Sequence, residues 1–286
     1  MAITYNNLHV DEAYSDKLEA NLYYQSIMVP GVTFDDSHTK GPGGAVYVHR
    51  LSVGAVMPGV PGRDFEDTDL TDELIPIKLN NCFQRSRKIY GVQAAAVGAD
   101  LKDQVLTLTE QEIQGSWEAA AVSCLVNEGS ASQDTTAPTV ENARDLVVDV
   151  RAEIIAAGGT PDVVLCSPAF YALILKTAGK EFLPVTNEAI AATGNVGTFL
   201  GMTWVEASVL GKSGFRYYDS SNSLNNVLFG KVDFVVYSHS ALSAITNVET
   251  ARLVDSESFV GSKAQVEVNT GYKVRDNQLV KVHRHA

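Results

Sequence analysis

Histidines and clustered acidic side chains are the residues of this sequence most able to do chemistry. His283 and His285 alternate on an expected strand and would need further ligands to hold a metal, so we interpret them as exposed ends of an edge strand. Gly211-Lys212-Ser213 is like the end of a phosphate-binding loop, but position 206, where that loop needs glycine, is Glu206. The sequence therefore predicts no catalytic, cofactor-binding or metal-binding residue.

Acidic residues crowd one stretch that follows Pro61-Gly62. The spacing does not fit a calcium loop, so a metal site is the least favoured of three interpretations. The other two are a solvated acidic loop and a contact in which the acids of one copy lie over a basic strand of a neighbouring copy. The candidate interface residues are Asp64, Glu66, Asp67, Asp69, Asp72, Lys78, Arg85, Arg87 and Lys88.

Composition narrows the class of protein. The chain has 286 residues, 45% of them hydrophobic, which is enough to bury a sizeable core in one or two domains. Its 22 basic and 34 acidic residues give a formal net charge of -12. That balance is unlike a nucleic-acid binder, whose affinity comes largely from Lys and Arg. It suits a protein that stays soluble at high concentration.

Cysteine usage and the N-terminal residues bear on the compartment. Cys82, Cys124 and Cys166 are too far apart for a CxxC pair and have apolar neighbours, so we expect three buried, reduced thiols. The first residues do not form a signal peptide, and no apolar run reaches the roughly 18 residues of a membrane span. We therefore expect a protein made and folded in a cytoplasm, with no membrane partner.

The first third of the chain is expected to be extended. Residues 1–30 carry few bulky core residues and are interpreted as an arm. Two expected strands, 45–53 and 73–90, flank a loop at 54–72 and would form a long hairpin. A loop of this length is typical of a binding segment, so it is the first indication of a role in assembly.

A long helix is expected next. Residues 92–126 carry apolar side chains at the spacing of one amphipathic helix. Gly98, Gly115, Thr107 and Thr109 favour a weak point or a break within it.

After a polar connector at 127–138 the pattern becomes α/β and then extended. The expected elements are a helix at 140–157 that ends at Gly158-Gly159, a strand at 161–166, a helix from Ala169 capped by Ser167, and strands within 202–206 and 226–237. Residues 244–285 alternate as strands, with a turn at Asp276-Asn277.

This order of parts resembles the major capsid proteins of tailed bacteriophages over nearly the whole chain. The residues that carry the resemblance are Ala13-Tyr-Ser-Asp-Lys-Leu-Glu-Ala20, Val29-Pro-Gly-Val32, the Leu74–Tyr90 strand entering a helix at Gly91, and Phe259 to Val282 with Gly271-Tyr-Lys-Val274 as a turn region. The resemblance implies an α+β phage major-capsid fold with an N-terminal arm, an extended β-hairpin loop, a long spine helix, a peripheral domain and an axial α/β domain.

The resemblance also implies a division of the chain. The expected parts are an N-terminal arm at 1–33, an extended loop with flanking strands at 34–90, a spine helix and peripheral domain at 91–137, an axial domain at 138–237, and a return to the peripheral domain at 238–286.

The function implied is that of a non-enzymatic major capsid protein. Such a protein self-assembles through hexamers and pentamers into an icosahedral shell of the virion. The shell encloses double-stranded DNA without sequence-specific binding and is assembled in the host cytoplasm. Scaffolding, portal and decoration proteins are the further partners suggested. Three alternatives stay open: an encapsulin-like nanocompartment shell, an α/β enzyme built on residues 140–237, and another virion protein such as a tail subunit.

Overall fold

The structure is a computed structural model of the chain. It describes residues 27–29, 31–35, 37, 45–51, 72–91, 101–181, 198–211, 216–219, 221–226, 229 and 231–285. Most of the predicted arm, the loop 52–71 and the expected start of the long helix at 92–100 lie outside the described residues.

The elements belong to two compact units, each made of separate stretches of the chain. One unit includes Phe83–Gly115 and Glu249–Val268, and the other includes Ser26–Cys82, Ser116–Val248 and Asn269–Ala286. In the described part of the chain the α-helices are α2 (Leu101–Glu128), α3 (Ala143–Ala156) and α4 (Pro168–Glu181). Short 3-10 turns form at η1 (Ser208–Gly211), η2 (His239–Ala241) and η3 (Asn277–Leu279).

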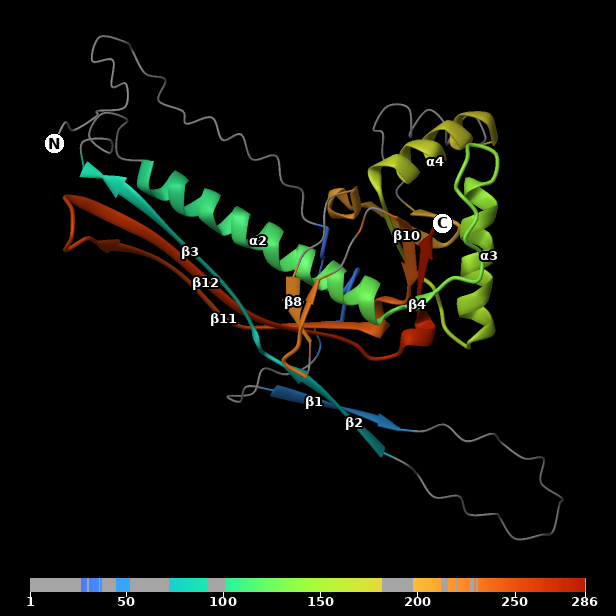
Figure 1. The fold of residues 1–286 in the computed structure, drawn as a ribbon, viewed down its shortest axis with the longest axis horizontal. Helices are drawn as coiled ribbons and strands as arrows, with labels where there is room; N and C mark the ends of the chain where they lie inside the picture. The colour runs from blue at the N-terminus through green and yellow to red at the C-terminus, as the bar shows by residue number, and fades with distance from the viewer. Residues whose placement is uncertain are drawn as a thin grey trace, which may run out of the picture. The chain divides into compact units, whose positions relative to one another are not determined.

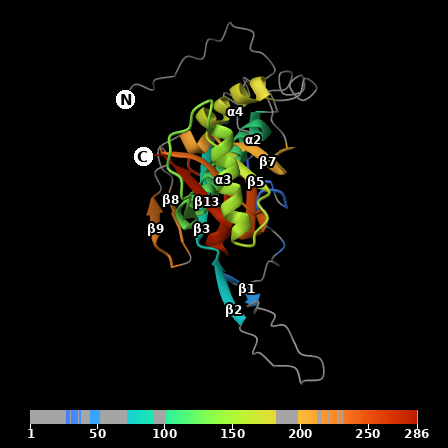
Figure 2. The ribbon, with the colours of Figure 1, turned by 90° about the vertical axis from the view of Figure 1, so that its right-hand side faces the viewer.

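A six-stranded sheet forms the larger core, in the order β4-β13-β10-β5-β7-β6. The strands are β4 (Ser130–Ala131), β5 (Val163–Cys166), β6 (Thr198–Phe199), β7 (Met202–Glu206), β10 (Val232–Tyr237) and β13 (Val280–Arg284). β5 and β10 are buried at every position, as expected of strands covered on both faces. α3 and α4 pack against these strands, and Figure 2 views the sheet from the side of α3.

The α/β pattern predicted for this region is confirmed. Phe170 of α4 and Phe234 of β10 pack with their ring centroids 4.5 Å apart at the centre of the core. Ser167 caps α4, because its hydroxyl oxygen accepts a hydrogen bond from the backbone N–H of Phe170 at 3.3 Å. Gly158 ends α3 with φ of 84°, a conformation that glycine adopts without strain.

β13 lies inside this sheet. It pairs antiparallel with β10 on one side and in parallel with β4 on the other. The interpretation of His283 and His285 as exposed ends of an edge strand is therefore wrong: His283 is fully buried, and the His285 side chain is 36% exposed. Strand alternation alone could not reveal this, because the strand that covers the outer side of β13 lies about 150 residues earlier.

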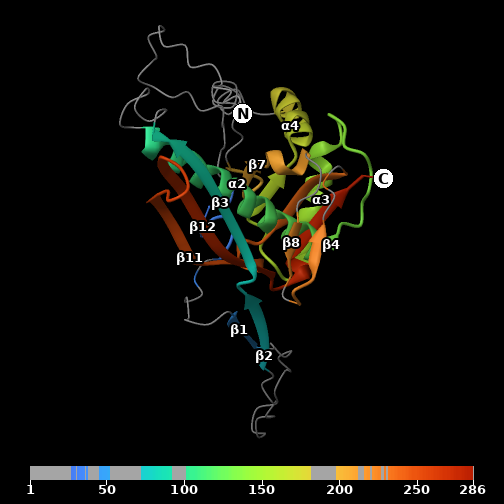
Figure 3. The ribbon, with the colours of Figure 1, turned by 60° about the vertical axis from the view of Figure 1, so that its left-hand side comes forward.

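A three-stranded sheet in the order β11-β12-β3 runs along α2 (Figures 1 and 3). Its strands are β3 (Asn81–Tyr90), β11 (Leu242–Asp255) and β12 (Gly261–Val274). Val266 and Val268 of β12 pack against Ile113 of α2, with Phe83 and Leu106 beside them. The alternation predicted for β12 is confirmed, since its valines are buried whereas Glu267 between them is exposed.

α2 runs through Gly115 without interruption. The hydroxyl groups of Thr107 and Thr109 donate to carbonyl oxygens one turn earlier, at 3.0 and 2.7 Å, and are thereby satisfied inside the helix. A break at Thr107, Thr109 or Gly115 is therefore wrong, and Gly98, the fourth residue of that prediction, lies outside the described residues. Every residue from 118 to 126 is buried, so tertiary packing outweighs the low helix propensity nearby.

The structure describes the base of the long hairpin that the sequence predicts, and this part is confirmed. β1 (Ala45–Leu51) and β2 (Asp72–Lys78) pair antiparallel, with Ala45 opposite Lys78 and Leu51 opposite Asp72. One face of the hairpin is buried through Val48, Ile75 and Ile77, which cluster with Ile245.

The single strand predicted at 73–90 is wrong, because β2 and β3 belong to different sheets. Asn81 explains the division. Its side-chain NH2 donates to the carbonyl oxygen of Tyr218, and its side-chain oxygen accepts from the N–H of Tyr218, both at 2.8 Å. Asn80 donates to the carbonyl oxygen of Asp219 at 2.6 Å. These bonds tie the junction to the small hairpin of β8 (Arg216–Tyr218) and β9 (Leu224–Asn226).

The turn predicted at Gly271-Tyr-Lys-Val274 is also wrong, because these residues belong to β12. A Cβ on Gly271 would lie 2.5 Å from the carbonyl oxygen of Lys78, so the close approach of two backbones requires glycine there. The turn follows at 275–279, where the Asp276 side chain accepts a hydrogen bond from the N–H of Gln278.

The predicted domain boundaries stay a prediction. The return segment 238–286 divides between two sheets, since β11 and β12 join β3 whereas β13 joins β10. β4, within the segment 91–137, likewise joins the six-stranded sheet. At the base of the predicted arm, the N–H of Ile27 donates to the buried carboxylate of Glu118 at 3.0 Å, and the Tyr237 hydroxyl donates to the carbonyl oxygen of Thr33 at 2.9 Å.

Candidate assembly surfaces

The predicted interface residues are only partly within the described chain. Asp72 is the first residue of β2 and lies on the exposed side of the hairpin. Its carboxylate is 2.7 Å from Nδ1 of His49. Lys78 is partly buried at the other end of β2. Four predicted residues lie outside the described residues: Asp64, Glu66, Asp67 and Asp69.

Arg85 and Arg87 of β3 already have a partner in their own chain. Both guanidinium groups pair with the carboxylate of Glu112 on α2; the separation from Arg85 is 3.5 Å. A shared carboxylate neutralises part of the charge that the sequence assigned to this strand. Sequence reasoning missed Glu112 because its distance along the chain from β3 hides the pairing.

Lys88 of β3 belongs instead to a surface at the β11–β12 turn, which we call the turn patch (Lys88, Tyr90, Phe259, Val260 and Lys263). The ammonium groups of Lys88 and Lys263 lie 5.7 and 5.9 Å from the centroid of the Phe259 ring, within the range of cation–π attraction. The Tyr90 ring is 5.0 Å from that of Phe259, and Val260 is 88% exposed.

The geometry of the turn patch is set by close backbone contact. The N–H of Gly91 donates to the carbonyl oxygen of Val260 at 3.0 Å. A Cβ on Gly261 would lie 2.1 Å from the carbonyl oxygen of Ile89, so only glycine lets β12 start this close to β3. Phe259 and Lys263 were missed by sequence reasoning, which followed charge and did not follow aromatic contacts.

The second exposed surface is one side of the β1–β2 hairpin, which we call the hairpin face. Its residues alternate with the buried side, and the register places Tyr47 opposite Pro76, His49 opposite Leu74 and Leu51 opposite Asp72. Tyr47, Leu51 and Leu74 are 61%, 54% and 53% exposed. The hairpin face is therefore an apolar surface with an acidic end.

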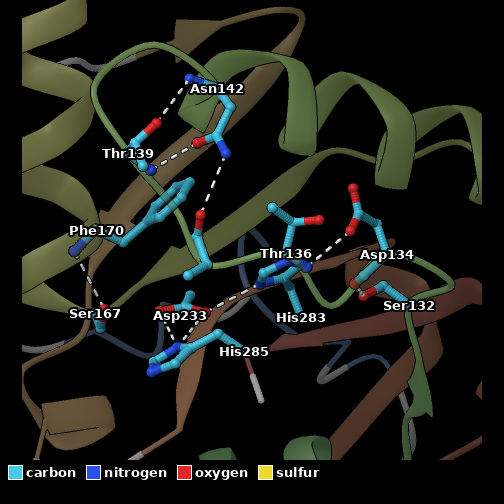
Figure 4. A network of polar contacts seen from close by, with 11 residues as sticks. Ser132, Asp134, Thr136, Thr139, Asn142, Ser167, Phe170, Asp233, His283 and His285 are labelled. Atoms are coloured by element: carbon cyan, nitrogen blue, oxygen red, sulfur yellow. Dashed lines mark hydrogen bonds and ion pairs between the residues drawn. The ribbon is translucent and has the colours of Figure 1, made fainter.

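A buried polar cluster lies at the start of β10 (Figure 4). Asp233 stands at a shift of register between β10 and β13, which is a β-bulge that redirects its side chain. Its carboxylate lies 3.1 Å from Nδ1 of His283 and 2.8 Å from Nδ1 of His285. The His283 ring stacks on Phe234 at 4.7 Å. The cluster joins β13 to β10 through side chains as well as backbone.

The cysteines differ from the prediction at one position. Cys124 and Cys166 are buried, as predicted. Cys82 is exposed, so the prediction that all three thiols are buried is wrong. Burial raises the pKa of both the Cys124 and Cys166 thiols well above the ordinary value.

Within the described residues no group of three or more His, Cys, Asp or Glu side chains is arranged to hold a metal ion. Searched over the same residues, the helices include none long and apolar enough to cross a membrane.

Comparison with solved structures identifies the class of fold. A structure from Mycobacterium phage Che8 is similar, with a TM-score of 0.71 at 17% identity over 97% of this chain and 98% of that one. The mature capsid of bacteriophage PhiM1 is similar with a TM-score of 0.67 at 12% sequence identity, and the match covers 96% of this chain and 91% of that one. For the capsid of Ralstonia phage GP4 the TM-score is 0.66 at 10% sequence identity, and the match covers 100% of this chain and 98% of that one. No family model and no curated protein matches the sequence.

The chain has the α+β fold of phage major capsid proteins. The likeness covers nearly the full length of both chains in each case, so it concerns the whole architecture. The resemblance seen in the sequence is confirmed at the level of the fold.

Proposed function

We propose that this chain is a phage major capsid protein that self-assembles through hexamers and pentamers into an icosahedral shell around the genome. The observation that carries the proposal is a fold shared end to end with phage capsid structures. A shell works through many modest contacts repeated by symmetry. Under this proposal the exposed hairpin face and turn patch would supply such contacts.

The proposal includes the absence of enzymatic activity. It is supported by the likeness to capsid structures, and the buried Asp233 cluster binds strand to strand. An encapsulin-like shell would share the fold but hold protein cargo, so cargo distinguishes the two. No observation here favours that alternative or an α/β enzyme.

The expected setting follows from the proposal. The protein would be assembled in the host cytoplasm and reside in the virion capsid. Its shell would hold double-stranded DNA without sequence-specific binding, consistent with a net charge of -12. Scaffolding, portal and decoration proteins remain partners to be tested by co-expression.

The domain roles and the interface are part of the proposal. Residues 1–33 would reach a neighbouring copy, 34–90 would form the extended loop, 91–137 and 238–286 the peripheral domain, and 138–237 the axial domain. The acidic loop would contact the basic strand of a neighbour through the nine candidate residues named above. The pairing of Arg85 and Arg87 with Glu112 makes Lys78 and Lys88 the clearer probes.

The decisive experiment is electron microscopy of the expressed protein, alone and with the products of neighbouring genes. Closed polyhedral shells, or hexamers and pentamers, are expected, and nuclease-resistant DNA should accompany shells from infected cells. A small oligomer that never assembles under any of these conditions would contradict the proposal. Shells that hold a protein cargo and no DNA would favour the nanocompartment alternative.

Deletion of residues 56–70 tests the role of the loop. The variant should keep the circular dichroism and the unfolding midpoint of the wild type, because the packed face of the hairpin lies outside the deleted residues. It should fail to form shells in sedimentation. Normal shells from this variant would remove the loop from the assembly contacts.

A further inference from the structure

The base of the β1–β2 hairpin is held to its own chain along its inner side, which is the side opposite the hairpin face. The apolar cluster with Ile245 lies in the middle of this side. Polar contacts lie on either side of the cluster, at Asn81 and at Arg50. From Glu73, the partner of Arg50 on β2, to Asn81 the extended chain spans roughly 25 Å.

The first anchor is formed by Asn80 and Asn81, which follow β2. The side chain of Asn81 is buried and makes two hydrogen bonds of 2.8 Å with the backbone of Tyr218, one as donor and one as acceptor. The side-chain NH2 of Asn80 donates to the carbonyl oxygen of Asp219 and to the side-chain oxygen of Asn222, at 2.6 and 2.9 Å. An amide that bonds in both directions copies the pairing of a strand residue, so the first anchor is directional.

The residues that receive the first anchor are themselves fixed. Tyr217, next to Tyr218, is buried, and its hydroxyl oxygen accepts a hydrogen bond from the side-chain NH2 of Asn127 on α2 at 3.0 Å. The carboxylate of Asp219 accepts from two backbone N–H groups of its own turn, at 2.8 and 3.0 Å. The small hairpin of β8 and β9 therefore connects the base of the β1–β2 hairpin to the end of α2.

The second anchor is the guanidinium group of Arg50. It donates to the carbonyl oxygen of Arg275 at 3.2 Å and pairs with the carboxylate of Asp276 at 2.5 Å. Asp276 also accepts from the N–H of Gln278 at 3.0 Å, and Arg275 pairs with Asp35 at 2.5 Å. The turn before β13 is therefore a fixed support for the second anchor.

Two anchors have an effect that neither has alone. Apolar packing has no preferred direction, so the contact with Ile245 by itself lets the hairpin tilt. One directional contact leaves a pivot, whereas two contacts separated by roughly 25 Å fix the line of the strands between them. We propose that Asn81 and Arg50 are positioning residues, which set the direction of the β1–β2 hairpin on its own chain before any neighbour is met.

The anchors have a consequence for assembly, which rests on the proposed shell function. A hairpin that is held in one direction has lost its orientational freedom before copies associate, so less entropy is lost at the moment of contact. Removal of the anchors should therefore weaken assembly even where no contact between copies has been changed. The direction of the hairpin itself can be measured without reference to shells.

Distances between spin labels test the direction of the hairpin. In a Cys82→Ser background, labels are placed at Leu51→Cys and Val148→Cys, two exposed positions on β1 and α3. Double electron–electron resonance of chains diluted with unlabelled protein reports the distances within one chain. Asn81→Ala and Arg50→Ala should each broaden the distribution of distances at least about twofold, and the double variant should broaden it further.

A second label pair, Leu224→Cys with Val148→Cys, is the internal control, because it joins β9 to α3 and omits the β1–β2 hairpin. This pair should stay narrow in every variant. The matched substitutions are Asn142→Ala and Arg252→Ala, which remove an amide and a guanidinium group that are bonded elsewhere. They should leave both distributions unchanged.

Two results would overturn the positioning role. An unchanged distribution for the labels at 51 and 148 in both anchor variants would mean that the apolar cluster is sufficient. Equal broadening of both label pairs would mean that the whole unit has loosened. If Asn81→Ala does not fold, Asn80→Ala takes its place, because this side chain is only partly buried and its loss removes two bonds of the first anchor.

Sedimentation of the same variants tests the consequence for assembly. The double variant should lower the shell yield about tenfold, because the hairpin must then be ordered during association. A wild-type yield from variants with a broadened distribution would overturn the role of the anchors in assembly. A wild type that never forms shells would instead contradict the shell function, and the label distances would still decide whether the anchors position the hairpin.

Discussion

β5 and β10 of the six-stranded sheet are buried residue after residue, whereas β12 of the three-stranded sheet alternates between buried and more exposed positions. The first sheet has helices on it and a closed core. The second has α2 against one face and polar side chains such as Gln265 and Glu267 on the other. A sheet that is covered on both faces buries its apolar side chains within one chain. A sheet that is covered on one face leaves its other face exposed to solvent.

The edge strands of the two sheets differ in the same way as their faces: those of the three-stranded sheet are more exposed. The six-stranded sheet ends in β4 and β6, each two residues long, so little unpaired backbone is left at its borders. The three-stranded sheet ends in β11 and β3, of 14 and 10 residues. Charged side chains on these longer edges, among them Lys88 and Arg252, disfavour uncontrolled strand addition.

The largest expected effect comes from the closed core. Phe234→Ala should lower the free energy of unfolding by about 3–5 kcal/mol, because it removes a buried ring that stacks on Phe170 and His283. Phe259→Ala, in the turn patch, should cost about 1 kcal/mol or less, since that ring is partly exposed. Urea unfolding followed by circular dichroism measures both, and equal losses would break the comparison.

The next effect concerns the polar cluster between β10 and β13. Asp233→Ala should cost about 2–3 kcal/mol, because it leaves two imidazole groups without their acceptor. Asp255→Ala is the matched change in the three-stranded sheet, where the carboxylate holds one hydroxyl near the surface, and should cost under about 0.5 kcal/mol. The same urea measurement applies. A small loss for Asp233 would mean that the bulge relaxes and the imidazoles find water.

A smaller effect is expected where β3 meets α2. Glu112→Gln removes the carboxylate that pairs with Arg85 and Arg87, all three of which are partly exposed. We expect a loss of about 0.5–1 kcal/mol at low salt, decreasing as salt screens the pair. Thermal unfolding at two salt concentrations tests this. A loss that does not depend on salt would indicate a packing role for Glu112.

Thiol labelling compares the sheets without changing stability. Cys82, in β3, should react with a maleimide in the native protein, whereas Cys166, in β5, should react only on unfolding. The reason is access together with a raised pKa, which keeps the buried thiol protonated. Mass spectrometry after a short pulse counts the labels, and Cys82→Ser should abolish the native reaction. Native labelling of Cys166 would show that the six-stranded sheet opens readily.

The sequence predicted well where local signals decide the structure. Ser167 and Gly158 mark the ends of helices, and the apolar run at β5 marks a buried strand. It failed where partners are distant along the chain. Asn81 divides a predicted strand through bonds to Tyr218, which lies 137 residues away.

The candidate surfaces show the same limit. Charge alone singled out Arg85 and Arg87, but Glu112 occupies both. The contact of Lys263 with Phe259 depends on a turn that only the fold forms. The assembly contact predicted from residue types therefore stays a prediction, and side-chain geometry shows which of its residues already have a partner in their own chain.

The interior position of β13 affects the timing of folding during synthesis. β13 fills the space between β4 and β10, and Ser130 beside it is 150 residues from Val280. At about 5–20 residues per second, a ribosome needs roughly 8–30 s to add that length. Until then the six-stranded sheet has a gap at β13, and a nascent chain lacks the finished core. Chains that stop early therefore lack this core, and under the proposed shell function we expect them to be excluded from assembly.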